Sequence, residues 1–199
     1  MTQVTEELTT ELVKKAQNGD LRAFEQLLGE YQGKIYNIAL GIMGNPHDAE
    51  DAVQNALIKI YRAIGSFKHR SKFSTWVYRV ATNVCMDEVR KKKRTSSVSS
   101  DELGEEIFSS DINTPEANAI NNEKMLHLKK AISSLRDDHR RVIVLRDING
   151  FSYEEIACIT SSSVGTVKSR INRARASLKD ILISTGYDFC ERVVKNDRL

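Results

Sequence analysis

SYEEIACITSSSVGTVKSRINRARASLK, residues 152–179, is the stretch that decides how this chain folds. Its first part predicts a short helix, because the Ser152 hydroxyl can cap the first turn while Glu155 reaches back to the Ser152 amide. Residues 160–163 then break the helical period, and a second helix follows from Val164. Two helices joined by a short turn predict a helix-turn-helix, a unit that places its second helix in the major groove of DNA.

The second predicted helix has two faces of opposite character. Apolar residues at spacings of three and four form a buried face: Val164, Val167, Ile171, Ala174 and Leu178. Side chains that can reach base edges share the opposite face: Lys168, Ser169, Asn172 and Arg173. The flanking cations expected to contact phosphates are Arg170, Arg175 and Lys179. The alternative is an ordinary solvated helix, but such a helix usually mixes charge signs, and residues 164–179 contain five cations and no anion.

Length and composition favour one or two small helical domains. The chain has 199 residues, of which 40% are hydrophobic and 29% charged, with only two prolines. No segment shows the alternation of apolar and polar residues that is typical of a half-buried strand, so we expect an all-α fold. The first ten residues do not have the pattern of a secretory signal, and no apolar run approaches the ~18 residues that span a bilayer. We therefore expect a cytoplasmic location.

The cysteines give no sign of a disulfide framework or a metal site. Cys85, Cys158 and Cys190 are odd in number and far apart, without a Cys-x-x-Cys pair. We expect each to be a small buried apolar residue, with Cys190 the most exposed. No metal and no cofactor is predicted.

Charge is segregated along the chain, although the net charge is only +3. The net charge is −3 over residues 1–65, +7 over 66–94, −6 over 95–126 and +5 over 127–199. The acidic segment is rich in Ser, Asp, Glu and Asn, a composition too polar to form a core. The sequence therefore predicts two small helical domains, residues 1–94 and 123–183, joined by an acidic flexible linker at 95–122 and followed by a tail at 184–199.

The amino-terminal domain is predicted to contain four helices, over about residues 6–18, 20–44, 45–65 and 74–94. The core stripe predicted for the third helix is Val53, Leu57, Ile60 and Ile64. A different face of that helix sets one apolar residue among polar ones: Asp51, Gln54, Asn55 and Ile58. An apolar residue on a face that the core does not require indicates a surface for a partner, and an ordinary acidic solvated face is the alternative.

Cations and aromatic residues are interleaved where the third predicted helix leads into the fourth. The loop cations are Lys68, His69, Arg70 and Lys72. On the fourth helix, Arg79 and Asn83 add side chains that donate hydrogen bonds in defined directions. Aromatic rings can stack on bases while cations follow phosphates, so this mixture suits single-stranded nucleic acid. The alternative for Phe73 and Trp76 is that they are ordinary core residues.

Three segments in this order resemble bacterial sigma factors of the extracytoplasmic-function (ECF) type: DAEDAVQNALIKIYRAI (48–64), FSTWVYRVATNVCMDEVR (73–90) and SYEEIACITSSSVGTVKSRINRARASL (152–178). The resemblance covers sigma region 2 at about residues 8–94 and region 4 at 123–183. It implies a subunit that binds core RNA polymerase and promoter DNA, has no catalytic residues, and is usually held inactive by an anti-sigma factor.

The same resemblance assigns roles by position. The face with Asp51, Gln54, Asn55 and Ile58 matches the surface that docks on the polymerase. The loop at 66–75 and the helix after it match the part that melts the minus-ten element and captures a flipped base. The face with Lys168 and Arg173 matches the part that reads the minus-thirty-five element. Asn55 stands where the family commonly has Glu. Ser161 stands where the turn of the helix-turn-helix commonly has Gly, so this turn is either left-handed or of another shape.

Two other classes of function compete with this one. An ordinary transcription regulator would use the helix-turn-helix on duplex DNA without polymerase, while its amino-terminal domain senses or dimerises. An enzyme is poorly supported, because the sequence has no Gly-x-x-x-x-Gly-Lys-Ser/Thr, no Gly-x-Ser-x-Gly and no His-Glu-x-x-His motif.

Overall fold

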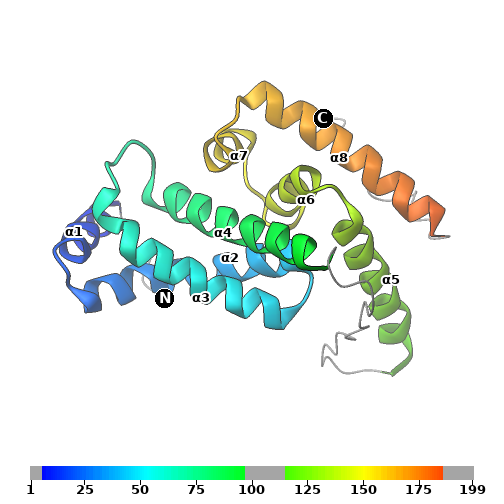
Figure 1. Ribbon diagram of the computed structural model, residues 1–199, viewed down its shortest axis with the longest axis horizontal. Coiled ribbons are helices and arrows are strands. Elements are labelled where there is room, and N and C mark those ends of the chain that lie inside the picture. The colour runs from blue at the N-terminus through cyan, green and yellow to red at the C-terminus, as the bar shows by residue number, and fades with distance from the viewer. Residues whose placement is uncertain (1–5, 97–114, 186–199) are drawn as a thin grey trace.

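A computed structural model describes residues 6–96 and 115–185, and every regular element within these ranges is helical. In chain order the elements are α1 (Glu6–Gln17), α2 (Leu21–Met43), α3 (Pro46–Ala63), the short 3₁₀ turn η1 (Ile64–Ser66), α4 (Phe73–Ser96), α5 (Pro115–Ser134), α6 (Asp137–Ile143), the π-helical η2 (Val144–Ile148), α7 (Tyr153–Thr160) and α8 (Val164–Ser184) (Figure 1). The prediction of an all-α fold is confirmed over the described residues. Among them, no helix is both long and apolar enough to cross a membrane.

Helices α1 to α4 enclose the core of the amino-terminal half. The largest fully buried side chains of α2 are Leu27, Leu28, Ile35, Ile38 and Ile42. Helix α3 meets them largely with small residues, because Ala49, Ala52 and Ala56 are buried beside Ile60. In the stripe predicted for α3, Ile60 and Ile64 are buried, while Val53 and Leu57 are partly buried and packed against the core. Alanines therefore let α3 approach its neighbours closely.

The ends of α2 and α3 lie where the sequence predicts them. Asp20 caps α2 by accepting a hydrogen bond from the Ala23 amide at 3.0 Å. Asn45 caps α3 by accepting from the Asp48 amide at 2.8 Å. Between the two helices Gly44 has a positive φ of 85°, a conformation that glycine adopts without steric cost.

The helix-turn-helix is formed by α7 and α8. The Glu155 amide donates to the Ser152 hydroxyl at 3.1 Å and the Ser152 amide donates to the Glu155 carboxylate at 2.8 Å, so the predicted capping box is present. On α8, Val167, Ile171 and Ala174 are buried as predicted, and Val164 and Leu178 are partly buried against the core. Ser161 ends α7 with φ 52° and ψ 45°, so the turn has the left-handed shape.

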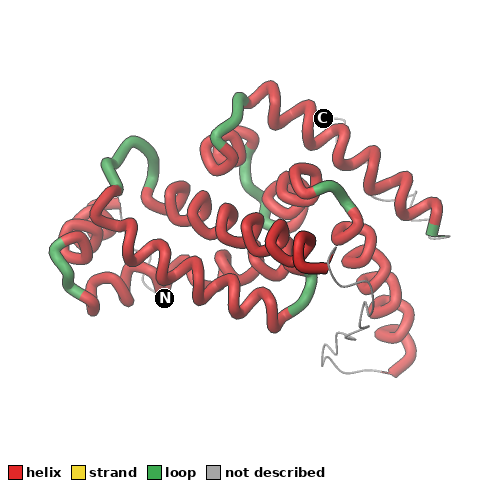
Figure 2. The backbone as a smooth tube through the Cα atoms, viewed as in Figure 1, coloured by secondary structure: helices red, strands yellow, loops and turns green. Residues whose placement is uncertain are grey.

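The two halves of the chain pack against each other along a contact that we call the seam, where α2 and α4 meet α6, η2 and α7 (Figures 1 and 2). The Phe151 ring lies against Tyr78, with 5.1 Å between centroids. Lys34 Nζ lies 4.2 Å from the centroid of the same Phe151 ring. Burial at this contact raises the pKa of Tyr78 to about 12.

Two further contacts make the seam close-fitting. The buried Arg140 of α6 donates through Nη1 to the Ile42 carbonyl at 3.2 Å, at the end of α2. Gly41 faces Val144, and a Cβ added at Gly41 would lie 2.8 Å from Val144 Cγ1. Only glycine therefore permits this approach without displacing its neighbour.

Helix α5 begins at Pro115, inside the 95–122 segment that the composition indicates as a linker. Residues 97–114 and most of the 184–199 tail, with Cys190, lie outside the described residues. The boundaries of the linker and of the domains stay predictions.

Candidate nucleic-acid interface

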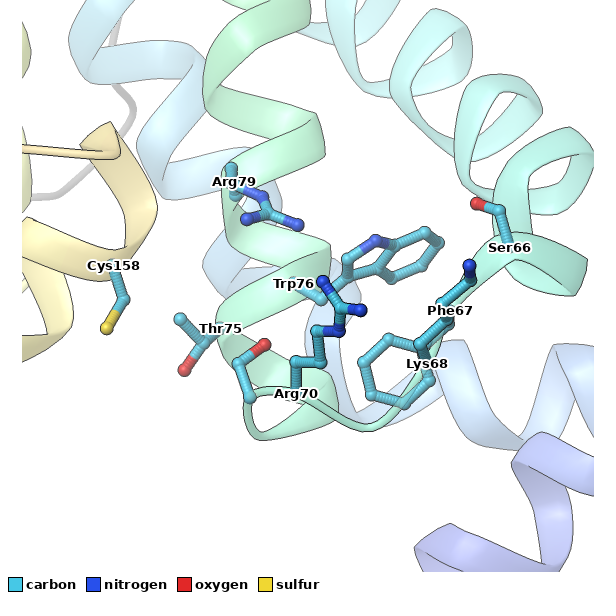
Figure 3. Close-up of a pocket in the computed structure, with 9 residues that line it drawn as sticks. Ser66, Phe67, Lys68, Arg70, Thr75, Trp76, Arg79 and Cys158 are labelled. Atoms are coloured by element: carbon cyan, nitrogen blue, oxygen red, sulfur yellow. The ribbon is translucent and has the colours of Figure 1, made fainter.

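The loop between η1 and α4 forms a pocket with the first turns of α4. The pocket has a volume of about 410 Å³ (Figure 3). It is lined by Ser66 at the end of η1, by Phe67, Lys68, Arg70 and Ser71 of the loop, by Thr75, Trp76 and Arg79 of α4, and by Cys158 of α7. Of the residues predicted to hold single-stranded DNA, it brings together Lys68, Arg70 and Arg79. A cavity with cations around an indole ring has the chemistry to accept an unpaired base and its phosphate.

The other three residues predicted for this surface lie outside the lining of the pocket. His69 has a positive φ of 52°, and its ring lies 4.7 Å from the Phe67 ring between centroids. Lys72 is exposed at the end of the loop. Asn83 is exposed one turn beyond Arg79, and its amide oxygen accepts a hydrogen bond from Arg141 Nη2 of α6 at 2.8 Å. Asn83 is therefore engaged by the carboxy-terminal half of the chain.

A cluster of aromatic rings packs beside the pocket. Phe67, Phe73 and Trp76 are buried, and the Phe67 ring lies 5.4 Å from each of the other two between centroids. The interpretation of Phe73 and Trp76 as core residues is thus confirmed. Trp76 also lines the pocket, so one side chain belongs to both the core and the candidate site.

The exposed face of α8 carries the residues predicted to read duplex DNA. Lys168, Asn172 and Arg173 are exposed, whereas Ser169 is half-buried. The Ser169 hydroxyl donates to the Thr166 carbonyl at 3.0 Å and accepts from Arg173 Nη2 at 3.3 Å. Lys168 Nζ lies 5.7 Å from the centroid of the Tyr153 ring. The four side chains therefore share one outward surface on which Ser169 orients Arg173.

The flanking cations of α8 differ in their contacts. Arg175 forms two hydrogen bonds to the Asp147 carboxylate, at 2.7 and 3.2 Å. Arg170 Nε lies 3.7 Å from Asp138, and Lys179 is exposed. A phosphate at Arg170 or Arg175 would thus compete with an ion pair within the protein.

The four residues of the predicted docking face on α3, Asp51, Gln54, Asn55 and Ile58, are all exposed. The Ile58 side chain is 49% exposed, which is unusual for isoleucine. Asp51, Gln54 and Asn55 border a pocket of about 270 Å³ whose other side includes Lys91 and Lys92 of α4. Tyr61, one turn beyond Ile58, is 44% exposed and extends this surface, although it is not among the residues predicted for it.

Cys158, which lines the pocket, differs from its prediction. Cys158 was expected to be buried but is exposed beside the pocket, because α7 points this side chain away from its own core. Cys85 is buried as expected, and burial raises the pKa of its thiol to about 12.

Arg141 is not among the residues that the sequence predicts for this surface, because its partner Asn83 is 58 residues away in the sequence. Burial, together with Arg90 and Arg170, lowers the pKa of Arg141 to about 10.

Comparison with known proteins agrees with this geometry. Two family models match the chain, Sigma-70 region 2 over residues 27–95 and Sigma-70 region 4 over residues 126–178. The RNA polymerase sigma-H factor of Pseudomonas aeruginosa is 36% identical over 90% of this chain and 96% of its own length. The ECF factor SigW of Bacillus subtilis is 39% identical over 84% and 92%, and the ECF sigma-E factor of Escherichia coli is 39% identical over 88% and 95%.

Two solved structures have the same fold. The sigma factor RpoE of Bartonella quintana, solved with the anti-sigma factor NepR, is 28% identical with a TM-score of 0.65, covering 82% of this chain and 98% of that one. CnrH, solved with the cytosolic domain of CnrY, is 25% identical with a TM-score of 0.63, covering 87% and 96%.

Proposed function

The chain belongs to the ECF group of RNA polymerase sigma factors, and on this basis we propose which of its surfaces serves each step of transcription initiation. A sigma factor is an initiation factor that directs core RNA polymerase to promoters and is not an enzyme. Residues 1–94 bind the polymerase and open the minus-ten element, and residues 123–183 bind the minus-thirty-five element. An anti-sigma factor controls the protein, which acts in the cytoplasm, where polymerase and promoters are.

The pocket beside the loop is the observation that carries this proposal. A duplex-binding regulator has no use for a cavity that combines Lys68, Arg70 and Arg79 with an indole ring. A protein that captures a base from melted DNA needs one, because the unstacking energy of a few kcal/mol has to be recovered in a pocket. We assign the pocket, with His69, Lys72 and Asn83 around it, to the non-template strand of the minus-ten element.

The second DNA contact is the exposed face of α8. Lys168, Asn172 and Arg173 read base edges in the minus-thirty-five element, with Ser169 orienting Arg173. Arg170, Arg175 and Lys179 contact phosphates, the first two after exchanging their carboxylate partners.

The partner of the exposed face on α3 is core RNA polymerase. Ile58 and Tyr61 offer apolar area there, and Asp51, Gln54 and Asn55 offer a polar rim, the usual make-up of a protein interface.

The seam has to open before both promoter elements can be bound. The two elements lie about 25 base pairs apart, which is ~85 Å of duplex at ~3.4 Å per base pair. Helix α8 has 21 residues and spans only ~30 Å, while α7 lies directly against α4. In this arrangement Arg141 also holds the amide oxygen of Asn83. The closed arrangement is therefore the free or inhibited form, and polymerase binds the open one.

The test uses holoenzyme reconstituted from the full chain and core polymerase. Selection from random single-stranded oligonucleotides gives the preferred minus-ten sequence, and fluorescence anisotropy then measures binding of variants that differ at one base. We expect a clear preference, which core enzyme alone does not have, and a change in the preferred base when residues 67–72 are replaced by another loop. Equal binding of all variants, or the free chain protecting duplex DNA without polymerase, would favour an ordinary regulator.

A further inference from the structure

We propose that Gln17, the last residue of α1, is a positioning residue that holds the minus-ten pocket in shape and so helps to set its base preference. The inference rests on the proposed function of that pocket. Gln17 Nε2 donates to the carbonyl oxygen of Ile64 at 3.0 Å and to that of Phe67 at 3.1 Å. These partners are 47 and 50 residues away in the sequence, so one amide group joins α1 to the start of the loop.

Gln17 projects from a firmly anchored helix. Leu12, Val13 and Ala16 of α1 are buried in the core of the amino-terminal half. The Gln17 side chain is itself half-buried, which limits the rotamers available to it. The amide therefore reaches the loop from a fixed point.

The two acceptors of Gln17 bracket η1, where helical structure ends and the loop begins. The Phe67 amide donates to the Ile64 carbonyl at 3.0 Å and closes this turn, and Gln17 binds the carbonyls at both of its ends. Phe67 lines the pocket, and its ring packs on Trp76, another lining residue. A shift of the Phe67 backbone would thus move Phe67 and the adjacent Lys68 relative to Trp76 and Arg79 of α4.

This contact comes from outside the part of the chain that the family model describes. The match to Sigma-70 region 2 begins at residue 27, whereas α1 ends at Gln17. Helix α1 lies beside η1 at one end of the amino-terminal half (Figure 1). A chain with another residue at this position would hold the same loop differently, so Gln17 offers a way to vary base preference without changing the loop.

The experiment compares holoenzymes made with Gln17→Met and Gln17→Glu, which keep the length of the side chain and remove its N–H donors. Anisotropy is measured with the selected minus-ten oligonucleotide and its single-base variants. We expect the discrimination between preferred and other bases to fall about threefold to tenfold in both variants, because two hydrogen bonds to the loop are lost. Affinity for core polymerase should not change, since the two hydrogen bonds of Gln17 go to Ile64 and Phe67, which are not residues of the docking face on α3.

Three comparisons make the outcome decisive. Gln26→Met changes an exposed glutamine on α2 and should leave base discrimination intact. If the Gln17 variants weaken every oligonucleotide by the same factor, Gln17 only stabilises the fold and the inference is wrong. Arg79→Ala tests the pocket itself. If Arg79→Ala abolishes discrimination and the Gln17 variants do not, the inference alone fails, whereas unchanged discrimination in all of them refutes the proposed function of the pocket.

Discussion

Ser161 is a residue under backbone strain at the turn of the helix-turn-helix. Its φ of 52° lies in the left-handed region, which costs a residue with a Cβ about 1 kcal/mol relative to glycine. Neighbouring bonds hold the conformation in place. The Ser161 and Ser162 amides both donate to the Ala157 carbonyl, and the Ser163 hydroxyl accepts from the Thr166 amide at 3.1 Å. The sequence left two shapes open for this turn, and these bonds favour the left-handed one.

We predict that Ser161→Gly raises the free energy of unfolding by roughly 0.5 kcal/mol. The relief of strain, about 1 kcal/mol, is partly offset by the greater freedom of glycine in the unfolded chain. Urea unfolding followed by circular dichroism measures the change. Ser162→Gly is the matched control, because residue 162 has no positive φ, and it should lower the stability. A destabilising Ser161→Gly would mean that the Ser161 side chain contributes more than its backbone costs.

At the scale of the element, the roles that we propose for two arginines of α8 differ, because Arg173 would read bases and Arg175 would contact a phosphate. We predict that Arg173→Ala loses about 1 to 3 kcal/mol of discrimination at particular base pairs of the minus-thirty-five element. Arg175→Ala should weaken all promoter sequences alike, because a phosphate contact carries no base information. Binding of holoenzyme to a library of minus-thirty-five variants measures both. If both variants lower the affinity for every sequence by the same factor, Arg173 is a phosphate contact and the reading face lies elsewhere on α8.

Most of what the sequence predicts correctly is local. Caps such as Asn45 and the Ser152–Glu155 pair act within one turn of helix, so the residues alone determine them. The contacts that the sequence does not reveal join distant positions. The bond from Arg141 to Asn83 and the pairing of Arg175 with Asp147 depend on how α6, η2 and α8 pack. Cys158 shows the same limit, since its position beside the pocket follows from the packing of α7 on α4.

At the scale of the whole molecule, the proposed opening of the seam can be tested directly at Gly41. Gly41→Ala places a Cβ 2.8 Å from the stiff side chain of Val144, which must displace the carboxy-terminal half or shift α2. The same change favours the helix itself by about 1 kcal/mol, so the amino-terminal half stays folded. We predict that the free chain opens.

Small-angle scattering of the purified chain measures the opening. A compact chain of this length has a radius of gyration of about 16 Å, and opening should increase the value for Gly41→Ala by several Å over the wild type. Gly33→Ala is the matched control on the same helix, because a Cβ there meets no atom within 4 Å. Identical scattering from both variants and the wild type would show that the seam tolerates the methyl group and that the closed form is not held by this contact.

The bond between Arg141 and Asn83 also has a consequence for the newborn protein. The two residues are 58 positions apart, and a ribosome adds residues at about 5 to 20 per second. For roughly 3 to 12 s, each new chain therefore contains Asn83 without Arg141. During that interval no carboxy-terminal half is present to hold Asn83 or to pack on α2 and α4. On the proposed role of the seam, a polymerase near the site of translation meets the amino-terminal half before the half that packs on it has been made.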